Sequence, residues 1–328
     1  SGLRIELICT LIISSYNDFW TSKGNTFHGF LVILRIMKLQ TPVIDEKCRT
    51  GISFNDKIMM LGSCFSDNIG GRLADFGFDV CVNPFGTLYN PASIASAVER
   101  LVSGEHFTEK DCVMIGAGCE KICSFSHHTS FSASDIPEFL EKANSSLDKA
   151  SAFFRECNKV IITLGTSWCF RHIESGNIVA NCLKHPAAEF QRERLDVHEI
   201  ERLLKVITDT YCGIRKEFIF TVSPIRHFKD GAHGNQLSKS ALLLGIDSII
   251  GDSVDYFPAY EIVMDELRDY RFYAEDMCHP TSQTTEYILE RFLDWALPTA
   301  EKTRLEENIR NFKRGCHIEN YSNRLQRI

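Results

Sequence analysis

The sequence predicts a three-layer α/β/α protein, in which a mostly parallel sheet lies between two layers of helices. Apolar runs of strand length alternate with amphipathic helical stretches along most of the chain. The run 159–165 is almost entirely apolar, which is typical of a parallel strand buried on both faces. The 328 residues, 44% of them hydrophobic, are enough for one large domain or two small ones with a substantial core.

Residues 1–36 differ in pattern from the rest of the chain. Their apolar patches are too short to span a bilayer. A signal peptide is an alternative interpretation of this segment, because Arg4 precedes an apolar run, although no small-residue cleavage site follows. Met37 resembles a natural start. We therefore expect 1–36 to be an appended or poorly ordered segment whose deletion leaves the thermal midpoint almost unchanged, 37–298 to be the folded domain, and 299–328 to be a charged tail.

Hydrophobic periodicity predicts the elements of the folded domain in order. We expect strands over 57–61, from 79, and over 159–165, 217–222 and 255–257, and helices from 64 and over 93–101, 136–157, 196–214, 237–250 and 284–295. The helix over 196–214 is supported by an apolar stripe of Ile200, Leu203, Leu204 and Ile207. Residues 170–194 form a polar insertion between two of these elements.

The rest of the chain is organised around the first strand-to-helix turn, Gly62-Ser63-Cys64. An apolar run breaks at Gly62, and apolar residues then recur on one face of the following helix, which carries Asp67 in its first turn. A turn of this kind that holds a Ser and a Cys is where acyl-transfer enzymes place a nucleophile. The alternative is an ordinary junction in which Gly62 allows a tight turn and Ser63 caps the helix.

Charge and cysteine content exclude several kinds of protein. A net charge of -7 without a basic block argues against a nucleic-acid partner. The 13 cysteines are odd in number and include no CxxC pair, and Cys119 and Cys123 lack a matching second pair. The adjacent His127 and His128 point to different sides of their element and are not expected to share a metal. We therefore expect reduced thiols, a cytoplasmic protein, no metal, no cofactor and no membrane partner, and the oligomeric state stays open.

Four loops that follow predicted strands carry small or polar residues. These are Ser63-Cys64, Gly86, Ser167 and Arg226-His227. Because the carboxyl ends of parallel strands meet at one edge of a sheet, we expect these loops to line one site.

Four motifs make the chain similar to a known family. They are Gly62-Ser-Cys-Phe65, Asn83-Pro-Phe-Gly-Thr-Leu-Tyr-Asn-Pro91, Ser223-Pro-Ile-Arg-His227 and Asp276-x-x-His279-Pro280. From about Met37 to about Trp295 the sequence resembles the GSCFA family, which is related to the SGNH (GDSL-type) hydrolases; Ser66 stands where the family name has Ala. The resemblance implies a flavodoxin-like, mostly parallel sheet of the SGNH-hydrolase kind.

The resemblance also implies roles for single residues. SGNH hydrolases carry a Gly-Asp-Ser turn, a Gly in a second block, an Asn in a third and a late Asp-x-x-His. Asp276 and His279 match the last motif, and Cys64 falls at the nucleophile position of the first. Gly86 matches the second block, and Ser167 replaces the Asn of the third. The N–H groups of Cys64 and Gly86 and the Ser167 hydroxyl would then stabilise the oxyanion.

The chemistry expected of these residues is acyl transfer. At a helix N-terminus beside an imidazole, Cys64 is expected to have a lowered pKa and to form a ready thiolate, while Ser63 stays open as the alternative nucleophile. His279 would act first as base and then as acid, oriented by Asp276. Without the resemblance, Asp276 and His279 could equally bracket a loop before a helix.

The loop after the strand over 217–222 offers candidates for substrate binding. Arg226 and His227, as paired cationic residues, suit a carboxylate or sugar substrate, and Asn235 is a third candidate. The alternatives are that His227 satisfies a strand-end carbonyl and that Lys239 holds the loop rather than a ligand.

These observations together predict an SGNH-like hydrolase or acyltransferase that acts on a small-molecule or saccharide ester, including an acylated sugar. The alternative is a catalytically impaired ligand-binding module of the same fold. Hydrolysis of a generic acyl ester separates the two.

Overall fold

A computed structural model describes residues 40–43, 48–211 and 216–325, which belong to one compact unit that begins at Gln40. The segment 1–36, which the sequence predicts to be appended, lies outside the described residues. Within the described residues, no helix is both long enough and apolar enough to cross a membrane.

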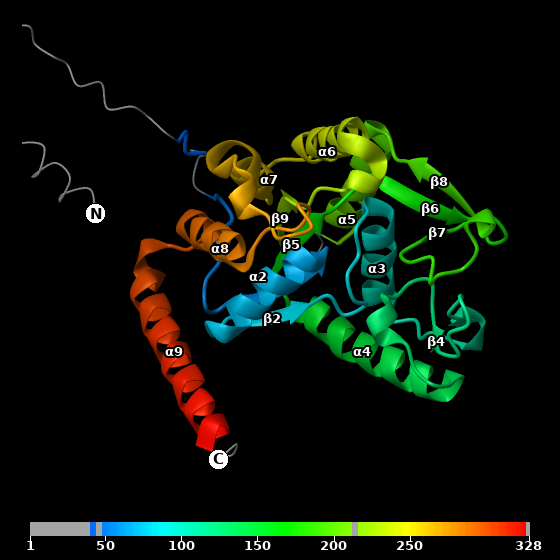
Figure 1. Ribbon diagram of the computed structural model, residues 1–328, viewed down its shortest axis with the longest axis horizontal. Coiled ribbons are helices and arrows are strands. Elements are labelled where there is room, and N and C mark those ends of the chain that lie inside the picture. The colour runs from blue at the N-terminus through cyan, green and yellow to red at the C-terminus, as the bar shows by residue number, and fades with distance from the viewer. Residues whose placement is uncertain (1–39, 44–47, 212–215, 326–328) are drawn as a thin grey trace, which may run out of the picture. The chain divides into compact units, whose positions relative to one another are not determined.

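The centre of the unit is a five-stranded sheet in which all neighbouring strands are parallel (Figure 1). Its strands are β1 (Lys57–Gly62), β2 (Asp79–Val82), β5 (Lys159–Leu164), β9 (Glu217–Val222) and β10 (Val254–Phe257), in the order β10-β9-β5-β1-β2. Counted along the chain, the five strands follow the 2-1-3-4-5 order of flavodoxin-like folds. The predicted three-layer, flavodoxin-like α/β/α class is therefore confirmed.

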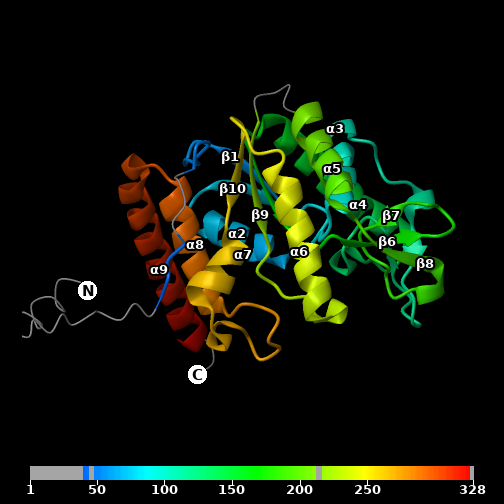
Figure 2. The ribbon, with the colours of Figure 1, turned by 90° about the horizontal axis from the view of Figure 1, so that it is seen from above.

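Helices cover both faces of this sheet, as Figure 2 shows. One face carries α3 (Pro91–Ser103), α4 (Ile136–Glu156), α5 (Val197–Tyr211) and α6 (Gly231–Asp247); the other carries α2 (Cys64–Asp75), α7 (Ala259–Glu261) and α8 (Ser282–Ala296). The two-residue period of a strand explains the division. In β1, Met59 and Leu61 pack with the first group, whereas Ile58 and Met60 pack with the second.

Two small antiparallel sheets accompany the main sheet. One consists of β6 (Trp168–His172), β7 (Ile178–Val179) and β8 (Phe190–Arg194) in the order β7-β6-β8, and the other of β3 (Val113–Met114) and β4 (Ile122–Cys123). The three-stranded sheet is the insertion that the sequence predicts over 170–194. Short 3-10 or π turns are η1 (Glu109–Asp111), η2 (Thr129–Phe131), η3 (Ala187–Glu189), η4 (Phe228–Asp230), η5 (Ile262–Leu267), η6 (Tyr270–Phe272) and η7 (Thr299–Glu301).

Helix α6 differs from its prediction at both ends. The sequence predicts a helix over 237–250, but α6 begins at Gly231 and ends at Asp247. Its first turns contain two glycines, each of which costs a helix about 1 kcal/mol relative to alanine. The added turns include the buried Asn235, whose side chain accepts a hydrogen bond from the His227 N–H at 3.0 Å. Hydrophobic periodicity does not detect a contact of this kind.

The C-terminal tail begins as a helix that packs on the end of α2. Helix α9 spans Lys302–Leu325. The side-chain amide of Asn308 donates to the Phe76 carbonyl at 2.7 Å, and the ring of Phe312 meets that of Phe76 edge-on with centroids 6.4 Å apart. The sequence predicts a charged tail, and these contacts attach the first half of it to the domain.

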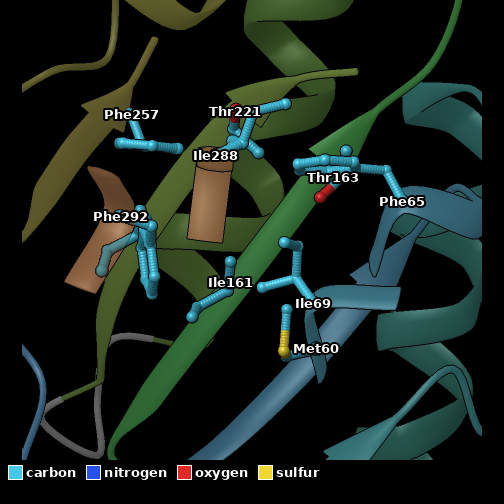
Figure 3. A pocket seen from close by; sticks show the side chains of 10 residues that line it. Met60, Phe65, Ile69, Ile161, Thr163, Thr221, Phe257, Ile288 and Phe292 are labelled. Carbon is cyan, nitrogen blue, oxygen red and sulfur yellow. The ribbon is translucent and has the colours of Figure 1, made fainter. Parts of the chain in front are cut away.

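A small cavity lies between the sheet and helices α2 and α8, as Figure 3 shows. Its volume is about 20 Å³, and its lining is apolar except for Thr163 and Thr221. The Thr221 hydroxyl is buried and has no hydrogen-bond partner among the described residues. A space of this size holds one water at most, so it belongs to the core and not to a ligand site.

Candidate active site

A cleft of about 460 Å³ opens at the carboxyl edge of the sheet. Its lining includes Ser63 and Cys64 after β1, Asn90 after β2, the loop 225–230 after β9, and His279. Trp168, Phe170 and Arg192 of the small antiparallel sheet form one wall. The structure thus brings together Ser63, Cys64, Arg226, His227 and His279, which the sequence predicts to share a site.

The turn that presents Cys64 requires a glycine before it. Gly62 has a φ of +139°, and a Cβ at this position would lie 2.2 Å from the Thr163 carbonyl oxygen of β5. Only glycine combines this backbone conformation with so close an approach. Ser63 then caps helix α2, and Cys64 is the first residue of the helix.

Asn83, which directly follows the neighbouring strand β2, holds this turn in place. Its side-chain oxygen accepts from the Gly62 N–H at 2.8 Å, and its amide nitrogen donates to the Asp67 carboxylate at 2.5 Å. Asn83 is buried and has a φ of +43°, a conformation that asparagine tolerates better than most residues. The second sequence motif therefore supports the first, a role that the motif alone does not reveal.

Ser63 and Cys64 differ in what their side chains are free to do. The Ser63 side chain is fully buried, and its Oγ accepts from the Phe65 N–H at 3.3 Å. Its hydroxyl is therefore used as a helix cap, as in the alternative reading of the turn. Cys64 is only partly buried and lines the cleft. The geometry favours Cys64 over Ser63 as the group that can reach a substrate.

The prediction that Cys64 has a lowered pKa is wrong. Burial raises the pKa of the thiol above its ordinary value, and the Asp67 carboxylate raises it further. The N–H groups of Cys64 and Phe65 lower it, but by less. The resting side chain at neutral pH is thus a thiol, and it needs a base to become a nucleophile.

Asp276 and His279 form a bonded pair in one surface loop. Nδ1 of His279 lies 2.5 Å from Oδ2 of Asp276, and the N–H groups of Cys278 and His279 donate to Oδ1 at 2.8 and 2.9 Å. These hydrogen bonds lower the pKa of Asp276 to about 2, and the bond from the His279 N–H has the largest effect. A charged carboxylate accepts the proton on Nδ1, which leaves Nε2 of His279 as the basic nitrogen.

Cys64 and His279 line the same cleft without being hydrogen-bonded to each other. No hydrogen bond joins the Cys64 thiol to the His279 ring in the part of the chain that the structure describes. The His279 side chain is 52% exposed and thus has room to turn. Catalytic hydrogen bonds are often absent without substrate and form in the complex.

Gly86 and Ser167 lie outside the lining of the cleft. The Gly86 N–H donates to the Asn83 carbonyl at 2.7 Å within its own turn. The Ser167 side chain is fully buried, and its N–H and Oγ both bond to the Ser238 Oγ, at 2.8 and 3.2 Å. Their predicted role as oxyanion donors stays a prediction, and both groups would have to leave these partners to perform it.

Asn90 is a candidate donor that the sequence analysis missed. Its Oδ1 caps helix α3 by accepting from the Ser93 N–H at 2.9 Å. Its Nδ2 has no partner among the described residues, although the side chain is 5% exposed and lines the cleft. An asparagine followed by proline at a helix start is a recognisable cap, and this pattern could have drawn attention to it.

Two side chains of α6, Asn235 and Lys239, form hydrogen bonds that position the loop after β9. Asn235 accepts from the His227 N–H and does not line the cleft, so it positions the loop. The buried Lys239 ammonium donates to the carbonyls of Gly165 and Ser223, each at 2.7 Å, and burial lowers its pKa to about 7. Lys239 therefore ties the ends of β5 and β9 together.

His227 is not a cation, contrary to the prediction of a cationic pair. Burial, followed by the charge of Lys239, lowers the pKa of His227 to about 4. His227 lines the cleft, and its Nε2 is buried without a partner among the described residues. At neutral pH, Arg226 alone carries positive charge in this pair.

The other histidine pair lies outside the cleft. His127 is fully buried among the rings of Phe85, Phe107, Phe131 and Phe139, and burial lowers its pKa to about 3. His128 caps the η2 turn. No group of three potential metal ligands occurs within residues 40–43, 48–211 and 216–325.

The fold and the cleft define an α/β/α protein with a thiol and an Asp-x-x-His pair at the carboxyl edge of its sheet. The chain matches the GSCFA family over residues 57–292 and belongs to that family, as its motifs predict. No curated protein matches the chain. It is similar to the crystal structure of the psychrotrophic esterase EstA from Pseudoalteromonas sp., inhibited by monoethylphosphonate. That similarity has a TM-score of 0.35 and 8% identity, and it covers 74% of this chain and 96% of the esterase.

Proposed function

We propose that this protein is an acyl-ester hydrolase with Cys64 as nucleophile, His279 as general base and Asp276 as the group that orients His279. One observation carries the proposal: a thiol at a helix start shares a cleft with an imidazole whose Nδ1 is bonded to a carboxylate at 2.5 Å. Acyl-transfer enzymes use a nucleophile, a base and a group that orients the base, and these three groups supply those parts.

The reaction proceeds in two halves. Nε2 of His279 takes the thiol proton as Sγ of Cys64 attacks the ester carbonyl carbon, which gives a tetrahedral oxyanion. The oxyanion collapses to a thioester, and the alcohol leaves with the proton from His279. Water then attacks the thioester with His279 as base, which releases the carboxylic acid and restores the thiol. Because burial raises the pKa of Cys64, the first proton transfer is required rather than optional.

Two donors within the cleft suit the oxyanion. The N–H of Cys64, at the first helical position, has no carbonyl partner among the described residues. The second donor is the unpartnered amide of Asn90, because Gly86 and Ser167 are bonded elsewhere. Removing one such donor typically costs about 2.7–4 kcal/mol of transition-state stabilisation.

Trapping the acyl-enzyme tests this function directly. The purified chain is mixed with p-nitrophenyl acetate, and both nitrophenolate release and the intact mass are followed. We expect an initial burst and an acetyl adduct on Cys64 that hydroxylamine removes. Cys278→Ser is the matched control, since Cys278 also lines the cleft, and it should keep both the burst and the adduct.

The same experiment separates the alternatives. An acyltransferase would form the same adduct but transfer it to an added alcohol faster than to water. A ligand-binding module of the same fold, which the engaged N–H of Gly86 and hydroxyl of Ser167 favour, would give neither burst nor adduct. An adduct on Cys278 alone would contradict the assignment of the nucleophile.

A further inference from the structure

Arg226 carries an unpaired guanidinium at the edge of the cleft. Arg226 is half-buried and lines the cleft. Its backbone N–H donates to the carbonyl of Cys278, the residue before His279, at 3.2 Å. The guanidinium lies over Phe228 at 4.4 Å and near Tyr273 at 5.5 Å. None of its side-chain N–H groups donates to any residue that the structure describes.

This environment sets Arg226 apart from the other arginines. In the described part of the chain, every other arginine is either ion-paired with a carboxylate or exposed to solvent. Long charged side chains are rarely withdrawn from water without a partner. A half-buried guanidinium with aromatic rings beside it and no ion-paired carboxylate among the described residues indicates that its partner comes from outside the chain.

The charge of the cleft supports the same conclusion. Arg192 also lines the cleft, but it is paired with Asp230 and stacked on Trp168 at 4.2 Å, so its charge is compensated. Lys229 lines the cleft as well and has no acidic partner among the described residues. The cleft therefore holds two uncompensated cations in a chain of net charge -7.

We propose that the substrate of this site is an ester that also carries an oxyanion group, such as a carboxylate, which Arg226 binds through its fork of N–H donors. The inference rests on the proposed function and adds the class of substrate to it. Arg226 provides the planar, bidentate geometry that fits such a group, and Lys229 adds a point charge that attracts it. The rings of Phe228 and Tyr273 beside Arg226 add cation–π attraction that favours this position of the guanidinium.

A matched pair of thiol reagents tests the proposal without any ester. Iodoacetate and iodoacetamide alkylate the same sulfur and differ mainly in the charge of one small group. The rate of labelling of Cys64 is measured with each reagent by mass spectrometry, and the ratio of the two rates is compared with that of mercaptoethanol. We expect the ratio of iodoacetate to iodoacetamide to be about tenfold higher at Cys64 than at the free thiol.

Variants show whether Arg226 causes the higher ratio of iodoacetate to iodoacetamide labelling at Cys64. Arg226→Met should bring the ratio down to that of mercaptoethanol, and Arg226→Lys should give an intermediate value because it keeps the charge but loses the fork. Arg155→Met is the control for net charge, since Arg155 is exposed at the end of α4 and lies outside the cleft. A ratio that Arg226→Met leaves unchanged would overturn the proposal.

A second measurement needs neither a reactive thiol nor turnover. Benzoate should raise the thermal midpoint of the full chain more than benzamide does, and this difference should vanish in Arg226→Met. Equal effects of the two ligands on the wild type would refute the anion site even if Cys64 proves unreactive. Absence of ester hydrolysis with a preserved benzoate effect would refute the hydrolase and leave the anion site standing.

Esters of known charge then locate the oxyanion group on the substrate. 4-Acetoxybenzoate carries the charge on the alcohol side, and monomethyl succinate carries it on the acyl side; methyl 4-acetoxybenzoate and dimethyl succinate are their neutral counterparts. One charged ester should exceed its counterpart in kcat/KM about tenfold in the wild type and lose this advantage in Arg226→Met, mainly through KM. No advantage for either charged ester would contradict the proposal.

Discussion

Ser63 and Cys64 are neighbours in sequence, and their substitution should have opposite effects. Ser63→Ala removes the oxygen that accepts from the Phe65 N–H and caps helix α2. Loss of such a cap costs about 1 kcal/mol of unfolding free energy, with a range of about 0.5–2. For a domain of this size, a loss of about 1 kcal/mol corresponds to a fall of about 2 °C in the thermal midpoint. The hydroxyl is fully buried, so its removal should leave a measurable fraction of the activity.

Cys64→Ala should show the reverse pattern. The thiol makes no hydrogen bond that holds the fold among the described residues, so the thermal midpoint should stay within about 1 °C of the wild type. Activity on p-nitrophenyl acetate should fall by about three orders of magnitude or more, because no other group in the turn can form the thioester.

The assay is a side-by-side measurement of kcat and of the thermal midpoint for both variants. A thiol reagent should also label Cys64 faster than the partly buried Cys81 and the buried Cys169, whose pKa values burial raises to about 11 and about 12. Replacing His279 should slow that labelling. Loss of activity in Ser63→Ala with an active Cys64→Ala would transfer the role to the serine and refute the reasoning.

Three further predictions concern other residues. Asn90→Asp keeps an oxygen that caps α3 but loses the amide donor, so kcat on p-nitrophenyl acetate should fall about 100-fold with little change in thermal midpoint; an unchanged kcat would exclude Asn90 from the oxyanion site. Thr221→Val replaces a buried hydroxyl that has no described partner, so urea unfolding should show a gain of about 1 kcal/mol, whereas a loss would indicate a hidden partner. The pKa of His227 is lowered to about 4 in the folded protein, so the unfolded chain gains a proton first as the pH falls. Stability should therefore decrease from about pH 6.5 to about pH 4, and His227→Gln should reduce this decrease in urea titrations at each pH.

The strands and most helices were predictable because their signals are local. The apolar run that forms β5 is buried along its whole length, and the stripe of Ile200, Leu204 and Ile207 packs into the core as periodicity predicts. The flavodoxin-like order of the strands came from the resemblance, because pairing across the sheet joins residues about a hundred positions apart, as Ile58 of β1 and Lys159 of β5 are. Local pattern contains no information on such pairs.

The missed features of the site share a physical cause. The hydrogen bonds of Asn83 to Gly62 and Asp67, and the free amide of Asn90, depend on side-chain positions that only the folded chain defines. The same holds for the pKa of Cys64, where burial outweighs the helix N-terminus. Residue type and spacing were enough to predict which residues line the cleft. The protonation state of Cys64 and the unpaired hydrogen-bond donor of Asn90 could be found only from the structure.

The two halves of the proposed catalytic pair, Cys64 and His279, are anchored very differently. The Cys64 turn is bonded to β5 and to Asn83, while His279 lies in an exposed loop closed mainly by its own bonds, such as that from the Ala274 N–H to the His279 carbonyl at 2.7 Å. Segments of this second kind open locally at a lower free energy than the core. On heating, the base should therefore leave the nucleophile before the sheet melts, so that inactivation precedes unfolding and reverses on cooling.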